Sequence, residues 1–234
     1  MVGSQQMMGC PPKSADQKAS LEASTLVFDL DGTLIDSLPG IRASLAEAFL
    51  TVGRRMPDND LRNAIGPPIG IIARRLAPTL TDQEVSQIER HYRNAYDSEG
   101  WCRTVAFDGV LQTLQSLRRR GLRLFIVTNK PHTPTEKIIT YLGWQDFFDG
   151  ILSRDSRIPV YASKGDILRD LLDTHGLAAH SALMLGDTVE DEEAAAANNL
   201  RFVHASYGYS TIISATTAIH SFPELLTLIA AKQP

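Results

Sequence analysis

Short runs of consecutive apolar residues alternate along the chain with longer stretches in which apolar residues recur every three or four positions. The apolar runs are residues 25–28, 122–127, 150–152, 182–185 and 201–204. Runs of this length without polar alternation are typical of strands that are covered on both faces of a parallel sheet. The helical patterns between them, such as residues 110–117 and 167–172, each form a single apolar stripe. Together they predict an α/β fold with a doubly wound, Rossmann-like parallel sheet.

One long stretch interrupts this alternation. Residues 38–103 carry only helical patterns, and they are too many for an ordinary connection between two strands. We therefore predict an all-helical subdomain inserted after the first strand, with a core made of residues 25–37 and 104–234. Residues 1–24 are polar and rich in small side chains, so we expect them to form a flexible leader.

Composition and charge narrow the classes of function. A chain of 234 residues can hold one α/β domain with a modest insert. Its formal net charge of -4 gives no electrostatic reason to expect nucleic acid or an anionic membrane as partner. No apolar run approaches the roughly 20 residues of a membrane span. Two cysteines, Cys10 and Cys102, cannot build a disulfide framework. We expect a soluble, cytoplasmic protein with a small-molecule ligand; the sequence does not indicate an oligomeric state.

Two carboxylates, Asp29 and Asp31, follow the first predicted strand. If the extended conformation continues that far, both point the same way from the strand end, where open α/β sheets bind ligands. Carboxylates so close together repel each other, and a divalent cation such as Mg²⁺ would relieve the repulsion. A polar turn is the simpler explanation of such a segment taken alone. A calcium-binding EF-hand is excluded, because Leu34 and Gly40 stand where that loop needs Gly and Glu.

Two further segments offer groups that could bind phosphate. Thr128 ends the second apolar run, and its hydroxyl could donate a hydrogen bond to a phosphate oxygen. Lys130 follows, and we interpret it as an exposed surface charge because lysines are usually solvated. Lys164 precedes a predicted helix and would by itself also be interpreted as a solvated lysine. It is, however, the only lysine between Lys137 and Lys232.

A last segment places Asp187 directly after the 182–185 run and Asp191 four residues further on. If a helix begins between them, the two carboxylates could lie close together and face one metal ion. Acids at the start of a helix are commonly capping residues, which is the alternative for Asp191.

Taken in order, these segments resemble the four motifs of hydrolases of the haloacid dehalogenase superfamily. The matching residues are D-L-D-G-T-L from Asp29, T-N-K from Thr128, Lys164, and G-D-T-x-x-D from Gly186. The phosphoglycolate-phosphatase-like subgroup, which carries a helical C1 cap after the first motif, is the most similar. The resemblance covers about residues 25–228. Gly165 departs from it, since many relatives have proline after the lysine.

The resemblance implies a magnesium-dependent phosphatase that hydrolyses a small phosphorylated metabolite, a phosphoglycolate-like phosphomonoester, through an aspartyl phosphate. It implies that Asp29 is the nucleophile and that Asp31 is the general acid and base. The implied metal ligands are Asp29, Asp31 through its backbone carbonyl, Asp187 and Asp191. The implied phosphate-binding residues are Gly32, Thr128, Asn129 and Lys164, and Thr128 and Lys164 also count as catalytic.

Two alternatives stay open. A sugar phosphomutase of the same superfamily shares the cap. A phospho-aspartate signalling receiver also combines clustered acids with Thr, Lys and Mg²⁺, although the long helical insert and Asp31 argue against it. Residues that select the substrate should lie in the cap, because closure places cap side chains against the leaving group. The candidates are Arg42, Arg62, Arg74, Arg75 and Arg93.

Overall fold

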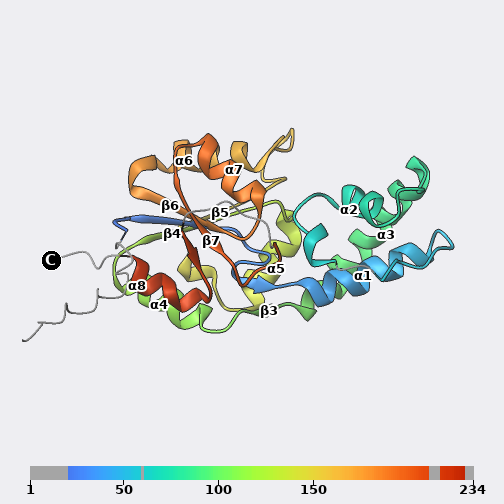
Figure 1. Cartoon of the computed structure of the whole chain (residues 1–234), viewed down its shortest axis with the longest axis horizontal. Helices are drawn as coiled ribbons and strands as arrows, with labels where there is room; N and C mark the ends of the chain where they lie inside the picture. The colour runs from blue at the N-terminus through green and yellow to red at the C-terminus, as the bar shows by residue number, and fades with distance from the viewer. Residues whose placement is uncertain (1–20, 59–60, 211–216, 230–234) are drawn as a thin grey trace, which may run out of the picture.

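The computed structural model describes residues 21–58, 61–210 and 217–229. In these ranges the core is a six-stranded sheet with the order β5-β4-β1-β6-β7-β8, in which every neighbouring pair is parallel (Figure 1). The strands are β1 Thr25–Phe28, β4 Arg123–Thr128, β5 Gly150–Ser153, β6 Ala182–Gly186, β7 Arg201–Ala205 and β8 Ala218–Ile219. The five predicted strands are confirmed. Strand β8 has two residues and is too short to produce a pattern in the sequence.

Helices cover both faces of this sheet, so the doubly wound fold is confirmed. Leu26 and Phe28 of β1 pack on one face and Val27 on the other, as expected when successive side chains of a strand alternate. On the Leu26 face lie α4 Val110–Arg119, α5 His132–Tyr141 and α8 Leu225–Leu228. On the Val27 face lie α6 Lys164–His175 and α7 Val189–Ala197. Short 3₁₀ helices occupy the connections Gln145–Phe147, Ala179–Ser181 and Phe222–Glu224.

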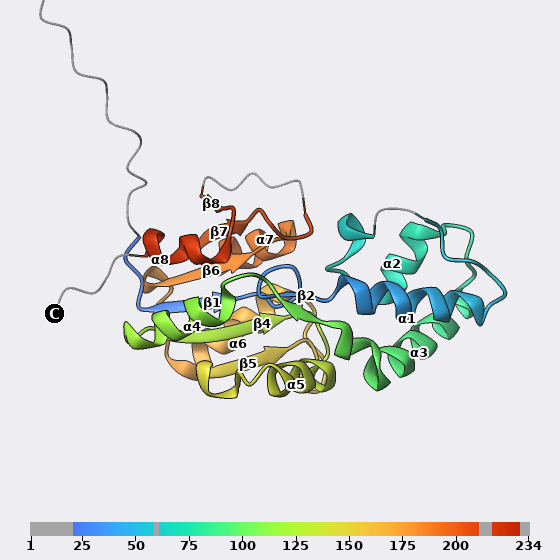
Figure 2. The same ribbon diagram turned by 90° about the horizontal axis from the view of Figure 1, so that it is seen from below.

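Residues 38–103 form a separate group of helices, which we call the helical segment. It comprises α1 Leu38–Leu50, α2 Ile69–Leu76 and α3 Asp82–Ser98, with the 3₁₀ helices η1 Arg62–Ala64 and η2 Gly100–Arg103. These helices bury their own apolar cluster and lie beyond one end of the sheet in both views (Figures 1 and 2). The described part of the helical segment contains no strand.

A two-stranded antiparallel ladder joins the helical segment to the core. Strand β2, Ile35–Asp36, carries the chain out of the core, and strand β3, Val105–Ala106, brings it back. Ile35 pairs with Ala106, and Asp36 pairs with Val105. The two connections therefore run side by side. The hydrophobic pattern did not predict these strands, because each has only two residues.

The predicted leader differs from the structure at its end. Residues 1–20 lie outside the described part of the chain. The backbone N–H of Leu21 donates to the carbonyl of Leu228 at 2.7 Å, and that of Ser24 donates to the carbonyl of Ser181 at 2.9 Å. Residues 21–24 thus pair with the core through the backbone, and the side chains of Leu21 and Ala23 also pack against its apolar cluster. Across the described ranges, no helix is both long and apolar enough to cross a membrane.

Candidate functional site

The site begins at the carboxyl ends of three adjacent strands. Strands β4, β1 and β6 are neighbours, so Thr128, Asp29 and Asp187 meet at one edge of the sheet. The backbone N–H of Asp29 donates to the carbonyl of Leu185 at 2.9 Å, which extends the ladder to the functional residue. All three side chains are buried although they are polar. Buried polar groups need partners, so what surrounds them defines the site.

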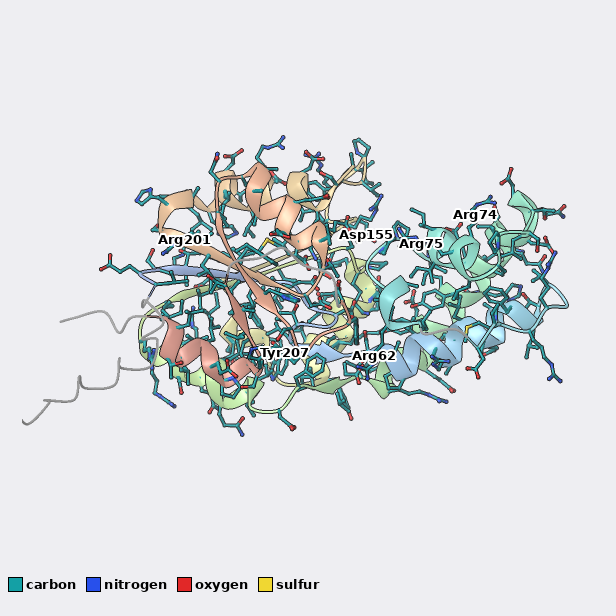
Figure 3. The ribbon with its side chains drawn as sticks, in the orientation of Figure 1. Arg62, Arg74, Arg75, Asp155, Arg201 and Tyr207 are labelled. Carbon is teal, nitrogen blue, oxygen red and sulfur yellow. The ribbon has the colours of Figure 1, made fainter. Side chains whose placement is uncertain are left out.

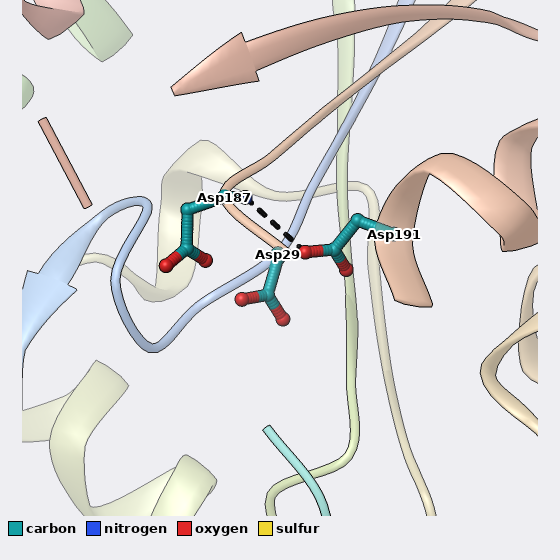
Figure 4. Close-up of side chains that lie close together, drawn as sticks. All are labelled: Asp29, Asp187 and Asp191. Carbon is teal, nitrogen blue, oxygen red and sulfur yellow. Dashed lines mark hydrogen bonds between the residues drawn. The ribbon is translucent and has the colours of Figure 1, made fainter. Parts of the chain in front are cut away.

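Asp29, Asp187 and Asp191 form a cluster of three carboxylates, which we call the acid cluster (Figure 4). One oxygen of each lies within 4.8 Å of one oxygen of the others. The start of α7 places Asp191, where Thr188 and Asp191 form a capping box. The backbone N–H of Asp187 also donates to Asp191 Oδ2 at 3.2 Å. Asp191 is therefore a capping residue and a member of the cluster at once.

Burial and mutual repulsion make the acid cluster unfavourable by itself. Burial, reinforced by the charge of Asp191, raises the pKa of Asp187 to about 7. Burial also raises the pKa of Asp29 well above its usual value, against the opposing effect of Lys164. Lys164 Nζ lies 2.5 Å from Asp29 Oδ1 and 2.5 Å from Asp191 Oδ1. Burial lowers the pKa of Lys164, but these two carboxylates outweigh it and raise the pKa above its usual value.

The acid cluster has the chemistry of a site for a divalent cation. Among the described residues, the ion pairs of its three carboxylates come from the single ammonium of Lys164, which leaves an excess of negative charge. Carboxylate oxygens are the ligands that Mg²⁺ prefers, and a divalent charge would remove the repulsion that raises the pKa of Asp187. The residues present therefore fit a bound metal ion.

Asp31 lies apart from the acid cluster. The backbone turns after Asp29 instead of staying extended, with the N–H of Leu34 donating to the carbonyl of Leu30 at 2.9 Å. Lys130 Nζ lies 3.0 Å from both carboxylate oxygens of Asp31, and the hydroxyl of Ser37 donates to Oδ1 at 2.5 Å. The side chains of Asp29 and Asp31 therefore do not share one cluster. Metal binding through the carbonyl of Asp31 stays a prediction.

The interpretation of Lys130 as an exposed charge is wrong. Its side chain is 4% exposed, because it is enclosed between Asp31 and the helical segment. Its ammonium lies 4.6 Å from the centre of the Tyr96 ring, which comes from α3. Tyr96 in turn stacks on Tyr92, with 5.5 Å between the ring centres. Lysines are usually exposed, and only the fold shows that Lys130 pairs with a carboxylate 99 residues away in the sequence.

The remaining predicted phosphate-binding residues lie around the same edge. Gly32 has φ +85°, and a Cβ there would lie 2.3 Å from Asp187 Oδ2, so the turn requires glycine. The hydroxyl of Thr128 accepts from the backbone N–H of Lys130 at 3.1 Å. The Asn129 amide reaches across to the carbonyl of Gly66 at 3.5 Å, in the helical segment.

A pocket of about 240 Å³ separates this edge from the helical segment. On the core side it is lined by Asp29, Asp31, Thr128, Asn129 and Lys164. On the opposite side most of its wall is apolar or aromatic, and includes Ile41, Ile65, Ile69, Ile72, Tyr92 and Tyr96. A molecule in the pocket would therefore present one end to the carboxylates and lysine and the other to an apolar wall.

Of the five candidate arginines, Arg93 is the one that lines the described pocket. Figure 3 shows Arg62, Arg74 and Arg75 on the helical segment, where they arise from η1 and α2. Arg74 forms an ion pair with Asp82, and Arg42 forms one with Asp58 at 3.8 Å. Arg154 also lines the pocket, from the connection after β5. Sequence reasoning missed Arg154 because it lies outside the helical segment in the sequence, and only the fold brings it to the pocket.

Sequence reasoning also missed the loop that follows β7. The backbone N–H of Tyr209 donates to Asp187 Oδ2 at 2.8 Å. The hydroxyl of Tyr207 donates to the carbonyl of Thr33 at 2.7 Å (Figure 3 labels Tyr207). A Cβ on Gly208 would lie 2.4 Å from Asp187 Cβ. The signal in the sequence was the position of these residues directly after a predicted strand, where ligand-binding loops of α/β sheets occur.

Comparison with known proteins points in the same direction. The family model described as haloacid dehalogenase-like hydrolase matches residues 26–205. A phosphoglycolate phosphatase of Psychrobacter arcticus is 28% identical over 228 residues, which cover 92% of this chain and 99% of that protein. A 5'-nucleotidase of Pseudomonas aeruginosa is 31% identical over 196 residues, which cover 82% and 87%. A haloacid dehalogenase-like family hydrolase from Streptococcus pneumoniae has a similar structure, with a TM-score of 0.79, 27% identity and coverage of 87% and 97%.

Proposed function

The chain belongs to the haloacid dehalogenase-like hydrolases, and from this premise we propose that it is a magnesium-dependent phosphatase of small phosphorylated metabolites. The observation that carries the proposal is the acid cluster with Lys164 at the carboxyl edge of the sheet, where Asp29 and Lys164 line a pocket. A phosphoryl group bound there would meet a carboxylate nucleophile, an ammonium and a hydroxyl at once. The names of the phosphoglycolate phosphatase and 5'-nucleotidase relatives support this chemistry.

In the proposed mechanism the carboxylate of Asp29 attacks phosphorus, so that a bond from Asp29 to phosphorus forms while the ester bond breaks. Asp31 gives its proton to the leaving alkoxide and later takes a proton from the water that hydrolyses the aspartyl phosphate. Lys164 and Thr128 hold phosphoryl oxygens. Asp29, Asp187 and Asp191 would hold Mg²⁺, which supplies charge neutralisation for the phosphoryl oxygens when bound.

Lys130 and Ser37 give Asp31 a fixed place for this role. Their contacts hold the carboxyl at the boundary between the core and the helical segment, where it lines the pocket. A leaving group that occupies the far side of the pocket would therefore have its bridging oxygen next to Asp31. The helical segment would act as the cap that closes over the substrate and excludes water.

The wall of the pocket favours one type of leaving group. Glycolate has two carbons and a carboxylate, and it would leave most of the apolar wall around Ile41, Ile72 and Tyr92 without a partner. A nucleoside would cover this wall with an aromatic face. Arg93 and Arg154 could contact polar substituents at its edge. We therefore expect kcat/KM to be higher for nucleoside 5'-monophosphates than for phosphoglycolate, and a higher value for phosphoglycolate would contradict this choice.

A phosphatase assay tests the proposed function directly. The purified protein with Mg²⁺ should release p-nitrophenol and inorganic phosphate from p-nitrophenyl phosphate over many turnovers. A receiver would instead stop after one stoichiometric phosphorylation, and a phosphomutase would return the phosphoryl group to an organic product. Asp29→Asn should abolish turnover, because the amide is a poor nucleophile. Asp82→Asn is the matched control, since Asp82 is exposed at the start of α3 and outside the pocket. Retained turnover in Asp29→Asn would refute the nucleophile.

A further inference from the structure

The hydroxyl of Tyr209 lies where the chain leaves the core for the helical segment. It accepts hydrogen bonds from the backbone N–H groups of Ser37, at 2.8 Å, and Leu38, at 3.1 Å. It donates one to Asp36 Oδ1 at 2.9 Å. Tyr209 comes from the loop after β7, more than 170 residues further along the chain, and its residue exposure is 3%. The start of α1 is therefore attached to the loop that follows β7.

This attachment adds to a local contact at the start of α1, where Asp36 Oδ1 accepts from the backbone N–H of Leu38 at 3.0 Å. Ser37 occupies the N-cap position of α1, but its side chain makes no capping hydrogen bond, because its hydroxyl donates to Asp31. The first N–H groups of a helix need acceptors from outside the helix. Tyr209 supplies one, and a tyrosine hydroxyl, with one proton and two acceptor sites, is fully used by these three contacts.

The other end of the same residue lies on the acid cluster. The backbone N–H of Tyr209 donates to Asp187 Oδ2 at 2.8 Å. The preceding Gly208 leaves no space between the loop and the cluster, since a Cβ there would lie 2.4 Å from both Asp187 Cβ and the carbonyl oxygen of Gly32. The loop therefore cannot shift without moving against Asp187, and the hydroxyl of Tyr209 cannot shift without releasing the start of α1.

We propose that Tyr209 is a positioning residue that couples the orientation of the helical segment to the geometry of the acid cluster. The inference rests on the proposed function, since it places Mg²⁺ at the acid cluster. Rotation of α1 about residues 36–38 moves the two N–H groups that Tyr209 accepts from, and the same loop holds Asp187. Such coupling is reciprocal: ordering the acid cluster orders the start of α1, and closing the helical segment strengthens Mg²⁺ binding.

Amide hydrogen exchange tests the coupling without turnover. In the wild-type protein, Mg²⁺ should slow exchange at the N–H groups of Ser37 and Leu38. In Tyr209→Phe the Ser37 amide should exchange about tenfold faster, and Mg²⁺ should no longer slow it, because its acceptor is gone. The Leu38 amide keeps Asp36 Oδ1 as an acceptor at 3.0 Å, so its exchange should rise less. The backbone contact to Asp187 is kept in this variant, so the hydroxyl alone is tested. Exchange at both amides that matches the wild type, with and without Mg²⁺, would overturn the proposal.

Calorimetric titration with Mg²⁺ gives the second measurement. Tyr209→Phe should bind Mg²⁺ about threefold to tenfold more weakly, the range expected for one hydrogen bond. Inorganic phosphate should raise Mg²⁺ affinity in the wild type and raise it less in the variant. Unchanged Mg²⁺ affinity and an unchanged effect of phosphate would overturn the coupling alone. No Mg²⁺ binding by the wild type would overturn the proposed function, and this inference with it.

Two further variants separate coupling from a general loss of stability. Tyr161→Phe is the matched control, because Tyr161 is also a buried tyrosine, but its hydroxyl donates to Asp170 outside the pocket. It should keep wild-type exchange at residues 37 and 38 and wild-type Mg²⁺ affinity; equal losses in both tyrosine variants would overturn the proposal. Asp36→Ala removes the acceptor that the Tyr209 hydroxyl shares with the Leu38 N–H and should weaken Mg²⁺ binding in the same direction. If Tyr209→Phe does not fold, Asp36→Ala decides: wild-type Mg²⁺ affinity in it overturns the coupling.

Discussion

Two buried lysines mark two differently built halves of the site. Lys164 lies at the start of α6 and pairs with Asp29 and Asp191, all of which belong to the core. Lys130 pairs with Asp31 on one side and contacts the Tyr96 ring of the helical segment on the other. The first half is complete within the core. The second is completed by the helical segment, so opening should remove the Tyr96 ring from Lys130 and expose its ion pair with Asp31 to solvent.

The strongest test of the comparison is Lys164→Met. Its removal leaves three buried carboxylates without their ammonium and should cost about 5 kcal/mol of unfolding free energy without metal, the upper end for a broken buried pair. Turnover should fall about 10²- to 10³-fold, because a donor to phosphoryl oxygens is lost. Mg²⁺ should restore the stability but not the turnover. Denaturant unfolding with and without Mg²⁺ measures this, and a stability loss that Mg²⁺ leaves unchanged would contradict the acid cluster as the metal site.

Lys130→Met should behave differently. Asp31 keeps its hydrogen bond from Ser37 and its side chain is 16% exposed, so the loss of unfolding free energy should be about 3 kcal/mol, the lower end of the same range. Mg²⁺ should not restore it, because the carboxylate of Asp31 lies outside the acid cluster. Lys137→Met is the control for an exposed lysine: Lys137 of α5 contacts the Asp97 carbonyl at 2.6 Å and the Trp101 ring, and its loss should cost about 1 kcal/mol or less. If Mg²⁺ fully restored the stability of Lys130→Met, the two halves of the site would not differ in their response to metal.

The pH dependence of the stability of the metal-free protein should come from the acid cluster. The pKa of Asp187 is raised from 3.8 to about 7, chiefly by burial. Its contribution to stability is therefore fully present below pH 3.8 and is lost as the pH rises to about 7. Between about pH 5 and about pH 7 the unfolding free energy should fall by about 2 kcal/mol. Melting curves in a chelator should show this decline, and Mg²⁺ should flatten it; an equal decline with Mg²⁺ would argue against metal binding there.

The smallest effect is expected where the helical segment touches Lys130. Tyr96→Leu removes the ring face beneath the ammonium and should reduce the coupling between positions 96 and 130 by about 1 kcal/mol. A double-mutant cycle with Lys130→Met isolates this term. Tyr96→Phe keeps the ring and should keep the coupling. Equal coupling for Phe and Leu would show that the ring face does not stabilise Lys130.

The parts of the site that lie close together in the sequence could be predicted. Asp29, Thr128 and Asp187 each stand at or directly after the end of an apolar run, and parallel strands bring such ends to one edge. Asp191 followed from the spacing of one helical turn. These inferences needed only local pattern and the family resemblance, and the structure brings all four residues to the same edge.

The parts that depend on distant contacts could not be predicted. Lys130 has the usual signature of a surface lysine, and its burial depends on Asp31 and on a ring of the helical segment. Tyr209 carries no pattern that points to the start of α1. The turn after Asp29, which separates Asp31 from the acid cluster, depends on Gly32 adopting φ +85°. In each case the contact depends on how the helical segment packs on the core or on a backbone turn. Neither produces a periodic pattern of hydrophobic residues in the sequence.

Because β2 and β3 pair side by side, the helical segment leaves the core and returns to it at one place, so another insert could be joined there. Asp36 pairs directly with Val105, and partners in an antiparallel ladder lie about 5 Å apart. A foreign helical insert, or even a tight hairpin turn, can therefore be grafted at this point without stretching the sheet. Grafts that start after Leu38 would keep the hydrogen bonds to Tyr209. Chimeric proteins of this kind would exchange the substrate-selecting wall while leaving the carboxylates at the strand ends in place.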